Sequence, residues 1–265
     1  MAAVGASRRS SSRAATPAFV LHSHDWSESS LILDLFTRDH GRVVAVAKGA
    51  KRPYSQLRSV LMPFQRIDVV FGAKQSAEAE VWLLRQAEWG GGQAWPGGAA
   101  FLPGFYANEL LTRLLPRFDA LPRLWDAYAA LLPALTQPGA VHAALRAFEL
   151  MTLRQLGHLP ELSVHSATAM LLEDDVLYTL HPELGVTEAD HEDPALPGWL
   201  LSQIESALSP AFTGDRSLGL PEPLLQTCLP ASSELRNLLR AVLHYHVGPQ
   251  PLRTRQLMLD LTQTP

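Results

Sequence analysis

The chain has little of several residue types, and each shortage excludes a class of protein. It contains one cysteine, Cys228, in 265 residues, so neither an intramolecular disulfide nor a cysteine-based zinc cluster can form. A single cysteine also fits a compartment where thiols stay reduced. No apolar stretch reaches the ~20 residues that cross a bilayer. Charged residues make up only 18%, below the ~25% of an average globular protein.

The motifs of common enzyme classes are missing as well. Gly90 and Gly92 follow an expected strand, but Trp95 stands where a dinucleotide fingerprint has its third glycine. Lys48-Gly49 is not preceded by the glycine spacing of a phosphate loop. The sequence has no Gly-x-Ser-x-Gly elbow and no His-Glu-x-x-His pair. Because no nucleophile, base and orienting group come together, we expect a protein that is not an enzyme.

Metal chemistry has little support in the sequence. His22 and His24 share one face of an expected strand, but no further ligand stands near them in sequence. His244 and His246 lie on an expected helix, where positions i and i+2 do not face each other. The acidic run 173–175 lacks the glycine and the alternation of a calcium loop. We therefore expect no metal and no cofactor.

What the chain does have is a strongly uneven charge. The total is −4, but residues 1–95 hold 12 Lys+Arg against 8 Asp+Glu, and residues 96–265 hold 10 against 18. Residues 161–193 hold nine acids and no Lys or Arg: Glu161, Glu173, Asp174, Asp175, Glu183, Glu188, Asp190, Glu192 and Asp193. Such asymmetry indicates a basic interaction surface on the first part, although charge alone is equally consistent with an ordinary solvated surface.

Hydrophobic periodicity divides the chain into a tail and two domains, so we expect an α+β protein. Residues 1–16 have no periodic apolar face, which predicts a disordered tail. Residues 17–92 carry five short β-prone runs, a pattern typical of a five-stranded OB-fold barrel. The expected strands are Ala18–His22, Ser30–Phe36, Arg42–Ala47, Phe64–Phe71 and Glu78–Trp89.

A glycine-rich break around residues 90–98 separates the barrel from an α-helical domain over 93–265. Beyond it, apolar residues recur every three or four positions. Expected helices cover the periodic runs from Leu102 to Leu114, Leu121 to Leu135, Pro138 to Leu156, Pro197 to Leu208, Ser232 to Gly248 and Thr254 to Leu261. Elsewhere in 158–228 the sequence is proline-rich with poor periodicity, which predicts irregular structure.

The densest cationic stretch is Lys48–Tyr54, in an expected loop after the third strand. Cations interleaved with an aromatic side chain suit phosphate contacts and base stacking on single-stranded nucleic acid. An exposed charged loop of no special function fits the residues almost as well. The predicted DNA contacts are Arg42, Lys48, Lys51 and Arg52, with Arg58, Arg66 and Lys74 as secondary contacts.

Several motifs, in the right order, resemble the bacterial DNA repair protein RecO family. They are Phe19-Val-Leu-His-Ser, Trp26-Ser-Glu-Ser-Ser, Leu33-Asp-Leu-Phe-Thr, Gly41-Arg42, Val46-Ala-Lys48-Gly49-Ala50, Tyr106-Ala-Asn108-Glu109-Leu-Leu111, Leu145-Arg146-x-Phe148-Glu149 and Pro251-Leu252-Arg-Thr-Arg255. The match is dense over 18–160, thin over 161–228, and partly recovers after that.

The resemblance implies an OB-fold followed by a helical domain and a non-catalytic, cytoplasmic, nucleoid-associated accessory protein of recombinational repair, with no membrane partner. Such proteins bind single- and double-stranded DNA and anneal complementary strands. They contact the acidic C-terminal tail of single-stranded DNA-binding protein and pair with RecR to help load RecA. Two alternatives stay open: a general OB-fold module for RNA or oligonucleotides, and an adaptor that binds an acidic protein instead of DNA.

One departure from the family concerns zinc. Many relatives hold zinc with four cysteines in the region that spans about 160–230 here, where this chain keeps only Cys228. One thiolate cannot make a structural zinc site. We expect a degenerate zinc-finger-like region without zinc, held by apolar packing or partly mobile.

The partner's acidic tail ends in a carboxylate and carries an aromatic residue, so its capture requires a cation beside an apolar groove. The motif match suggests Arg146, with Arg113 and Arg154 as neighbours. Arg146 and Arg154 lie eight residues apart, about 80° around a helix, and can share a broad face. The alternative for Arg146 is a structural i,i+3 pair with Glu149.

Overall fold

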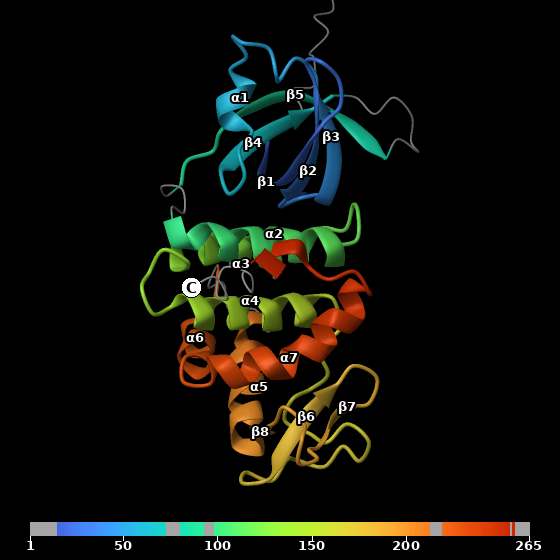
Figure 1. The fold of residues 1–265 in the computed structure, drawn as a ribbon, viewed down its shortest axis with the longest axis vertical. Helices are drawn as coiled ribbons and strands as arrows, with labels where there is room; N and C mark the ends of the chain where they lie inside the picture. Colours follow the sequence, from blue (N-terminus) through green and yellow to red (C-terminus); the bar gives the residue numbers. More distant parts are fainter. Residues whose placement is uncertain (1–14, 73–79, 93–97, 213–218, 255, 258–265) are drawn as a thin grey trace, which may run out of the picture.

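The computed structural model describes residues 15–72, 80–92, 98–212, 219–254 and 256–257. A β-barrel lies at one end, a group of helices in the middle, and a small three-stranded sheet at the far end (Figure 1). The predicted tail lies almost wholly outside the described residues, as does most of the helix expected at Thr254–Leu261. None of the helices in these ranges is long and apolar enough to cross a membrane.

The barrel is closed and has five strands in the order β1-β2-β3-β5-β4. Neighbouring strands are antiparallel except for β3 and β5, which pair in parallel. Alternating Val, Leu, Ile and Ala side chains fill its interior. This confirms the predicted α+β class with an OB-like barrel first. The elements are β1 (Thr16–Asp25), β2 (Leu31–Thr37), β3 (Gly41–Ala47), α1 (Leu57–Val60), β4 (Arg66–Phe71) and β5 (Val81–Trp89).

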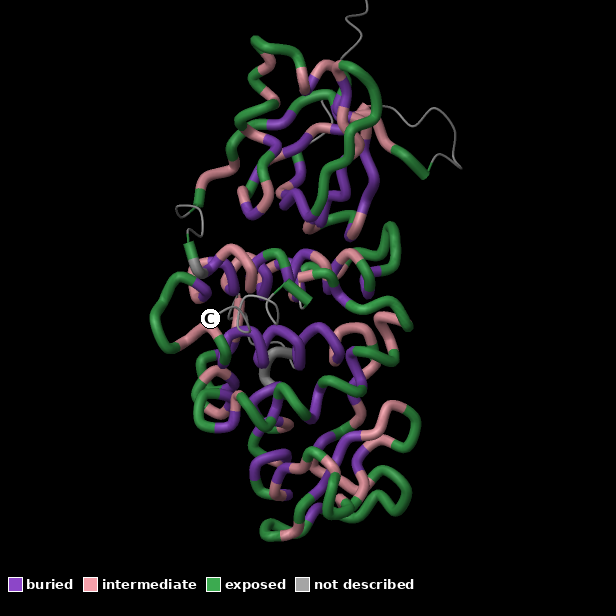
Figure 2. The backbone as a smooth tube through the Cα atoms, viewed as in Figure 1, coloured by how far each residue is buried: buried purple, intermediate pink, exposed green. Residues whose placement is uncertain are grey.

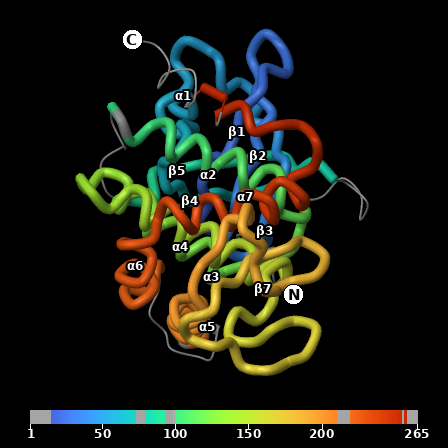
Figure 3. The backbone as a smooth tube through the Cα atoms, turned by 60° about the horizontal axis from the view of Figure 1, so that its bottom comes forward, coloured from blue at the N-terminus to red at the C-terminus, as the bar shows by residue number. Residues whose placement is uncertain are grey.

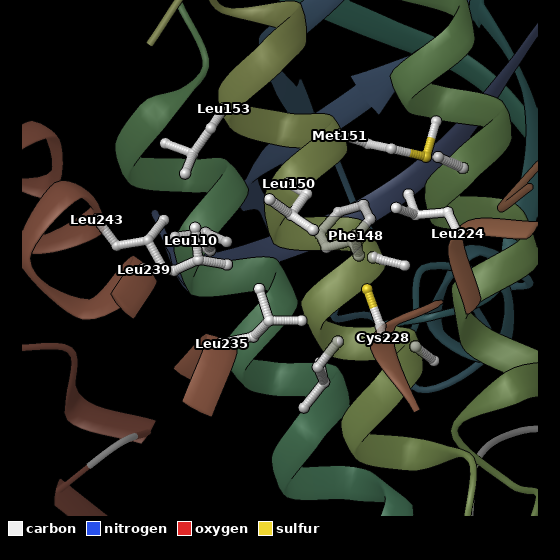
Figure 4. Packing of buried hydrophobic residues seen from close by; sticks show 14 of the residues in the cluster. Leu110, Phe148, Leu150, Met151, Leu153, Leu224, Cys228, Leu235, Leu239 and Leu243 are labelled. Atoms are coloured by element: carbon white, nitrogen blue, oxygen red, sulfur yellow. The ribbon is translucent and has the colours of Figure 1, made fainter. Parts of the chain in front are cut away.

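The helical part is built around one central helix, α4, which packs against α2, α3, α6 and α7. Every residue from Ala143 to Leu153 is buried, so this stretch of α4 has no solvent face, and the helix is largely purple in Figure 2. Its apolar side chains meet those of α2, α6 and α7 in one core (Figure 4). The elements are the 3-10 turn η1 (Gly98–Ala100), α2 (Phe101–Leu114), α3 (Pro122–Ala134), α4 (Val141–Gln155), α5 (Gly198–Phe212), α6 (Glu222–Cys228) and α7 (Ser232–Val247).

The region expected to be irregular contains a small antiparallel sheet of order β7-β6-β8, formed by β6 (Leu177–His181), β7 (Gly185–Glu188) and β8 (Leu196–Pro197). Buried Tyr178, Leu180 and Val186 join this sheet to the helical core. The strands are too short for their alternation to stand out in sequence, so periodicity missed them. Apolar packing holds this subdomain together.

The barrel and the helices share a buried seam. Strand β1 has a bulge between Val20 and His22, and the carbonyl oxygen of Leu21 accepts a hydrogen bond from Asn108 Nδ2 of α2 (3.0 Å). The indole Nε1 of Trp125 on α3 donates to the carbonyl oxygen of Phe36 (3.1 Å). These contacts join barrel and helices into one packed unit.

A glycine makes a second close approach at this seam possible. Gly41 has φ +66°, and a Cβ there would lie 1.7 Å from the carbonyl oxygen of Asp119. The positive φ and the absence of a side chain let the β2–β3 turn rest against the segment after α2. Arg38, from the same turn, forms a bidentate pair with Asp126 of α3 at 3.1 Å.

Candidate nucleic-acid interface

The loop after β3 holds the predicted cations on the outside of the barrel. Gly49, at φ +75°, turns the chain, and the amide of Arg52 donates to the carbonyl oxygen of Gly49 (3.2 Å). Lys48, Arg52 and Arg58 are exposed, and Tyr54 is 99% exposed. A tyrosine ring with no protein packing is available for a flat ligand. The structure therefore places Lys48, Arg52 and the free Tyr54 ring in this loop, and Arg58 on the adjoining helix α1.

Lys51 fixes this loop to the neighbouring β1–β2 connection. Its Nζ pairs with Asp25 (3.0 Å) and donates to the carbonyl oxygen of Ser27 (3.2 Å). Its backbone amide donates to Ser29 (3.0 Å). Trp26, on that connection, is 65% exposed and adds a second aromatic ring that the sequence reasoning did not assign. We call Trp26, Lys48, Lys51, Arg52, Tyr54 and Arg58 the basic loop surface.

Of the remaining predicted DNA contacts, Arg42 and Arg66 lie elsewhere. Arg42, on β3, pairs with Asp34 (2.9 Å) and its side chain is only 15% exposed, so its charge is used inside the protein. Arg66 is exposed on β4, with its guanidinium 5.6 Å from the Trp125 ring centre, at the seam with α3. Lys74 lies outside the described residues. Arg42 and Arg66 therefore do not join the loop cations in a single cluster.

The three arginines expected to hold an acidic tail are not brought together. Arg146 is 7% exposed and pairs with Glu149 at 2.5 Å, and Glu149 also accepts from the hydroxyl of Tyr106 (2.6 Å). Arg154 pairs with Glu205 and donates to the carbonyl oxygen of Pro160. The face they share on α4 points into the core. The alternative reading of Arg146, a structural pair with Glu149, describes its contacts.

Arg113 differs from these two. It is exposed in the last turn of α2 and makes no ion pair with any residue that the structure describes. Its charge contributes to lowering the pKa of Glu109. Among the three predicted arginines, Arg113 therefore presents a guanidinium to solvent.

The lone cysteine lies in the helical core, away from the small sheet. Cys228 of α6 packs among Phe148 and Leu224 (Figure 4), and burial raises the pKa of its thiol to about 12. A neutral buried thiol is a poor metal ligand. Over the described ranges, no group of three or more His, Cys, Asp or Glu could hold a metal ion. His22 and His24 stack edge to face, with ring centres 4.2 Å apart.

Comparison with known proteins covers both parts of the fold. Residues 11–89 match the family model "Recombination protein O N terminal", and residues 99–208 match "Recombination protein O C terminal". The chain is 47% identical to the DNA repair protein RecO of Polaromonas naphthalenivorans over 248 residues, which cover 92% of this chain and 95% of the relative.

The chain belongs to the RecO family. The RecO protein of Variovorax paradoxus is 46% identical over 251 residues, again covering 92% of this chain and 95% of the relative. Membership confirms the resemblance seen in the motifs and supports a role in DNA repair and recombination. In this RecO-family chain, the basic loop surface lies on the barrel, within the first of the two matched segments.

Proposed function

We propose that this RecO-family protein binds single-stranded DNA on the basic loop surface, and also double-stranded DNA through its cations alone. The observation that carries the proposal is the pairing of exposed Lys48, Arg52 and Arg58 with exposed Tyr54 and Trp26 in one place. Cations neutralise phosphates without reading sequence. An aromatic ring stacks on any base, for about 1–3 kcal/mol per base.

We further propose that this mode of binding promotes annealing of complementary strands. A strand held by its phosphates and by a few stacked bases leaves most Watson–Crick edges free to pair. Neutralised phosphates also reduce the repulsion between two strands. Annealing by this route requires no chemical step, in agreement with the lack of enzyme motifs in the sequence. We propose a role without catalysis or cofactor.

The annealing assay tests this proposal directly. A dye-labelled strand and its quencher-labelled complement are mixed with the protein, with and without a coat of single-stranded DNA-binding protein. We expect wild type to accelerate pairing and Lys48→Ala/Arg52→Ala to lose most of the acceleration. Arg236→Ala/Arg240→Ala removes two exposed charges from α7 and is the matched control. No acceleration by wild type, or a clear preference for RNA over DNA in competition, would overturn the proposal.

The partners that the family resemblance implies are the acidic tail of single-stranded DNA-binding protein, RecR and, indirectly, RecA. Because Arg113 is the exposed one of the three predicted arginines, we propose that Arg113 is this protein's contact for the acidic tail. A fluorescent acidic peptide with a free terminal carboxylate should bind wild type about tenfold more tightly than Arg113→Ala, the size of one charge-assisted contact. Equal affinity would remove Arg113 from that site.

A further inference from the structure

Arg253 and Thr254, in the segment after α7, are bound to α2 through the carboxylate of Glu109. Glu109 accepts hydrogen bonds from the backbone amides of Arg253 (2.9 Å) and Thr254 (3.0 Å) and from the Thr254 hydroxyl (2.7 Å). Burial by itself raises the pKa of Glu109, but these bonds and Arg113 outweigh it, and the pKa is lowered. Leu252 is buried beside them. Two sequence motifs more than 140 residues apart therefore meet here.

This attachment places Arg253 beside the barrel. Figure 3 shows the C-terminal segment in red, returning over α2 toward β1. Burial is the largest cause that lowers the pKa of His22. His24 and Arg253 are also close enough to lower the pKa of His22. Arg253, His22 and His24 are all exposed. We call these three residues the seam surface.

The acids near the seam surface already have partners. Asp34 and Glu109 both act on His22 in the direction that raises its pKa. Asp34 is buried and paired with Arg42 (2.9 Å). Glu109 is bound by the C-terminal segment and lies close to Arg113. The exposed charge that remains at the seam is therefore positive, and it grows as His22 gains a proton.

Strand β1 connects the seam surface with the basic loop surface. It runs from His22 and His24 to Asp25, where Lys51 of the basic loop forms its ion pair. Three residues of strand span about 10 Å. Cations therefore lie at both ends of this stretch of β1: Arg52 and the paired Lys51 at the loop, and Arg253 at the seam.

We propose that a DNA strand bound on the basic loop surface continues along β1 onto the seam surface, where Arg253 contacts a phosphate and His22 and His24 add contacts, of which the one from His22 strengthens with protonation. This inference rests on the proposed function, because it extends the same binding site. It gives the segment after α7 a role: the attachment to Glu109 brings Arg253 to the barrel. The inference also predicts a DNA-binding site that is longer than the basic loop surface alone.

Oligonucleotide length separates the two surfaces. Single OB folds cover about 4–16 nucleotides, so we compare oligothymidylates of about 8 and about 30 nucleotides. For the long one, Arg253→Ala should reduce the slope of log affinity against log salt by about 0.7, the value of one phosphate contact on a single strand. For the short one, the slope should not change. The backbone bonds to Glu109 persist in this variant, so the fold is retained.

Arg236→Ala, which removes one exposed charge from α7, is the matched control. If Arg253→Ala and Arg236→Ala give the same slope on the long oligonucleotide, the inference is overturned. It is also overturned if Arg253→Ala spares DNA but abolishes binding of an acidic peptide, because the seam would then serve a protein tail. Loss of binding at both lengths in Lys48→Ala/Arg52→Ala supports DNA binding by the basic loop surface. Retained binding in that double variant refutes the proposed function, irrespective of the result for Arg253→Ala.

Proton linkage gives an independent readout. An anion at the seam favours protonated His22, so affinity for the long oligonucleotide should rise severalfold between pH 8 and pH 6. His22→Asn should remove most of that rise, whereas His244→Asn, at an exposed position on α7, should keep it. An identical pH profile in wild type and His22→Asn would contradict the role of His22.

Discussion

Asn108 makes a buried hydrogen bond across the junction between barrel and helices, and Asn108→Ala should be strongly destabilising. Asn108 is 2% exposed. Its Nδ2 donates to the carbonyl oxygen of Leu21, which the β1 bulge frees from the strand ladder, and its Oδ1 accepts from the hydroxyl of Tyr128. Alanine would leave one buried acceptor and one buried donor unpaired, at about 1–3 kcal/mol each. We expect a loss of about 2–5 kcal/mol in the free energy of unfolding.

Urea unfolding followed by circular dichroism measures this loss. Tyr128→Phe should cost less, about 1–2 kcal/mol, because the larger loss comes from Asn108 itself. Since both variants remove the same hydrogen bond, the double variant should cost at least about 0.5 kcal/mol less than the sum of the two. Asn237→Ala, at an exposed position on α7, is the control. A cost for Asn108→Ala no larger than the control's would refute the reasoning.

Two further predictions concern buried charge and pH. Arg146→Ala should lower the free energy of unfolding by about 3–5 kcal/mol, because it leaves Glu149 buried without its cation; stability equal to that of Arg236→Ala would contradict this. The rings of His158 and His246 stack at 3.8 Å, and burial lowers both pKa values from 6.5. The free energy of unfolding should therefore fall as the pH drops below about 6.5, and it should fall less steeply in His246→Asn than in wild type. Parallel pH profiles of the two proteins would disprove the link between histidine protonation and stability.

The barrel could be predicted because its information is local. Alternating apolar residues and turn signals gave five strands, and the structure contains five strands at those places. The same reasoning found α2, α3, α4 and α7, whose apolar residues recur at helical spacing. The sheet of β6, β7 and β8 was missed because strands of two to five residues carry too few alternations to count.

The candidate site was only partly predictable, because burial decides which cations are available. Lys48 and Arg52 lie in the loop after β3 and Arg58 lies on the adjoining α1, and the local composition was enough to find them. Helical spacing placed Arg146 and Arg154 on one face, but it could not show that α4 is surrounded by other helices, which turns that face inward. The position of Arg253 depends on a contact with Glu109 that no local pattern encodes.

The central claim is that the basic loop surface binds single-stranded DNA through its phosphates. The most direct test is a salt titration of oligothymidylate affinity for wild type, Lys48→Ala/Arg52→Ala and Arg236→Ala/Arg240→Ala. Two lost phosphate contacts should reduce the slope of the loop variant by about 1.4 and leave the control unchanged. A loop variant with the wild-type slope would contradict the account and place the DNA elsewhere.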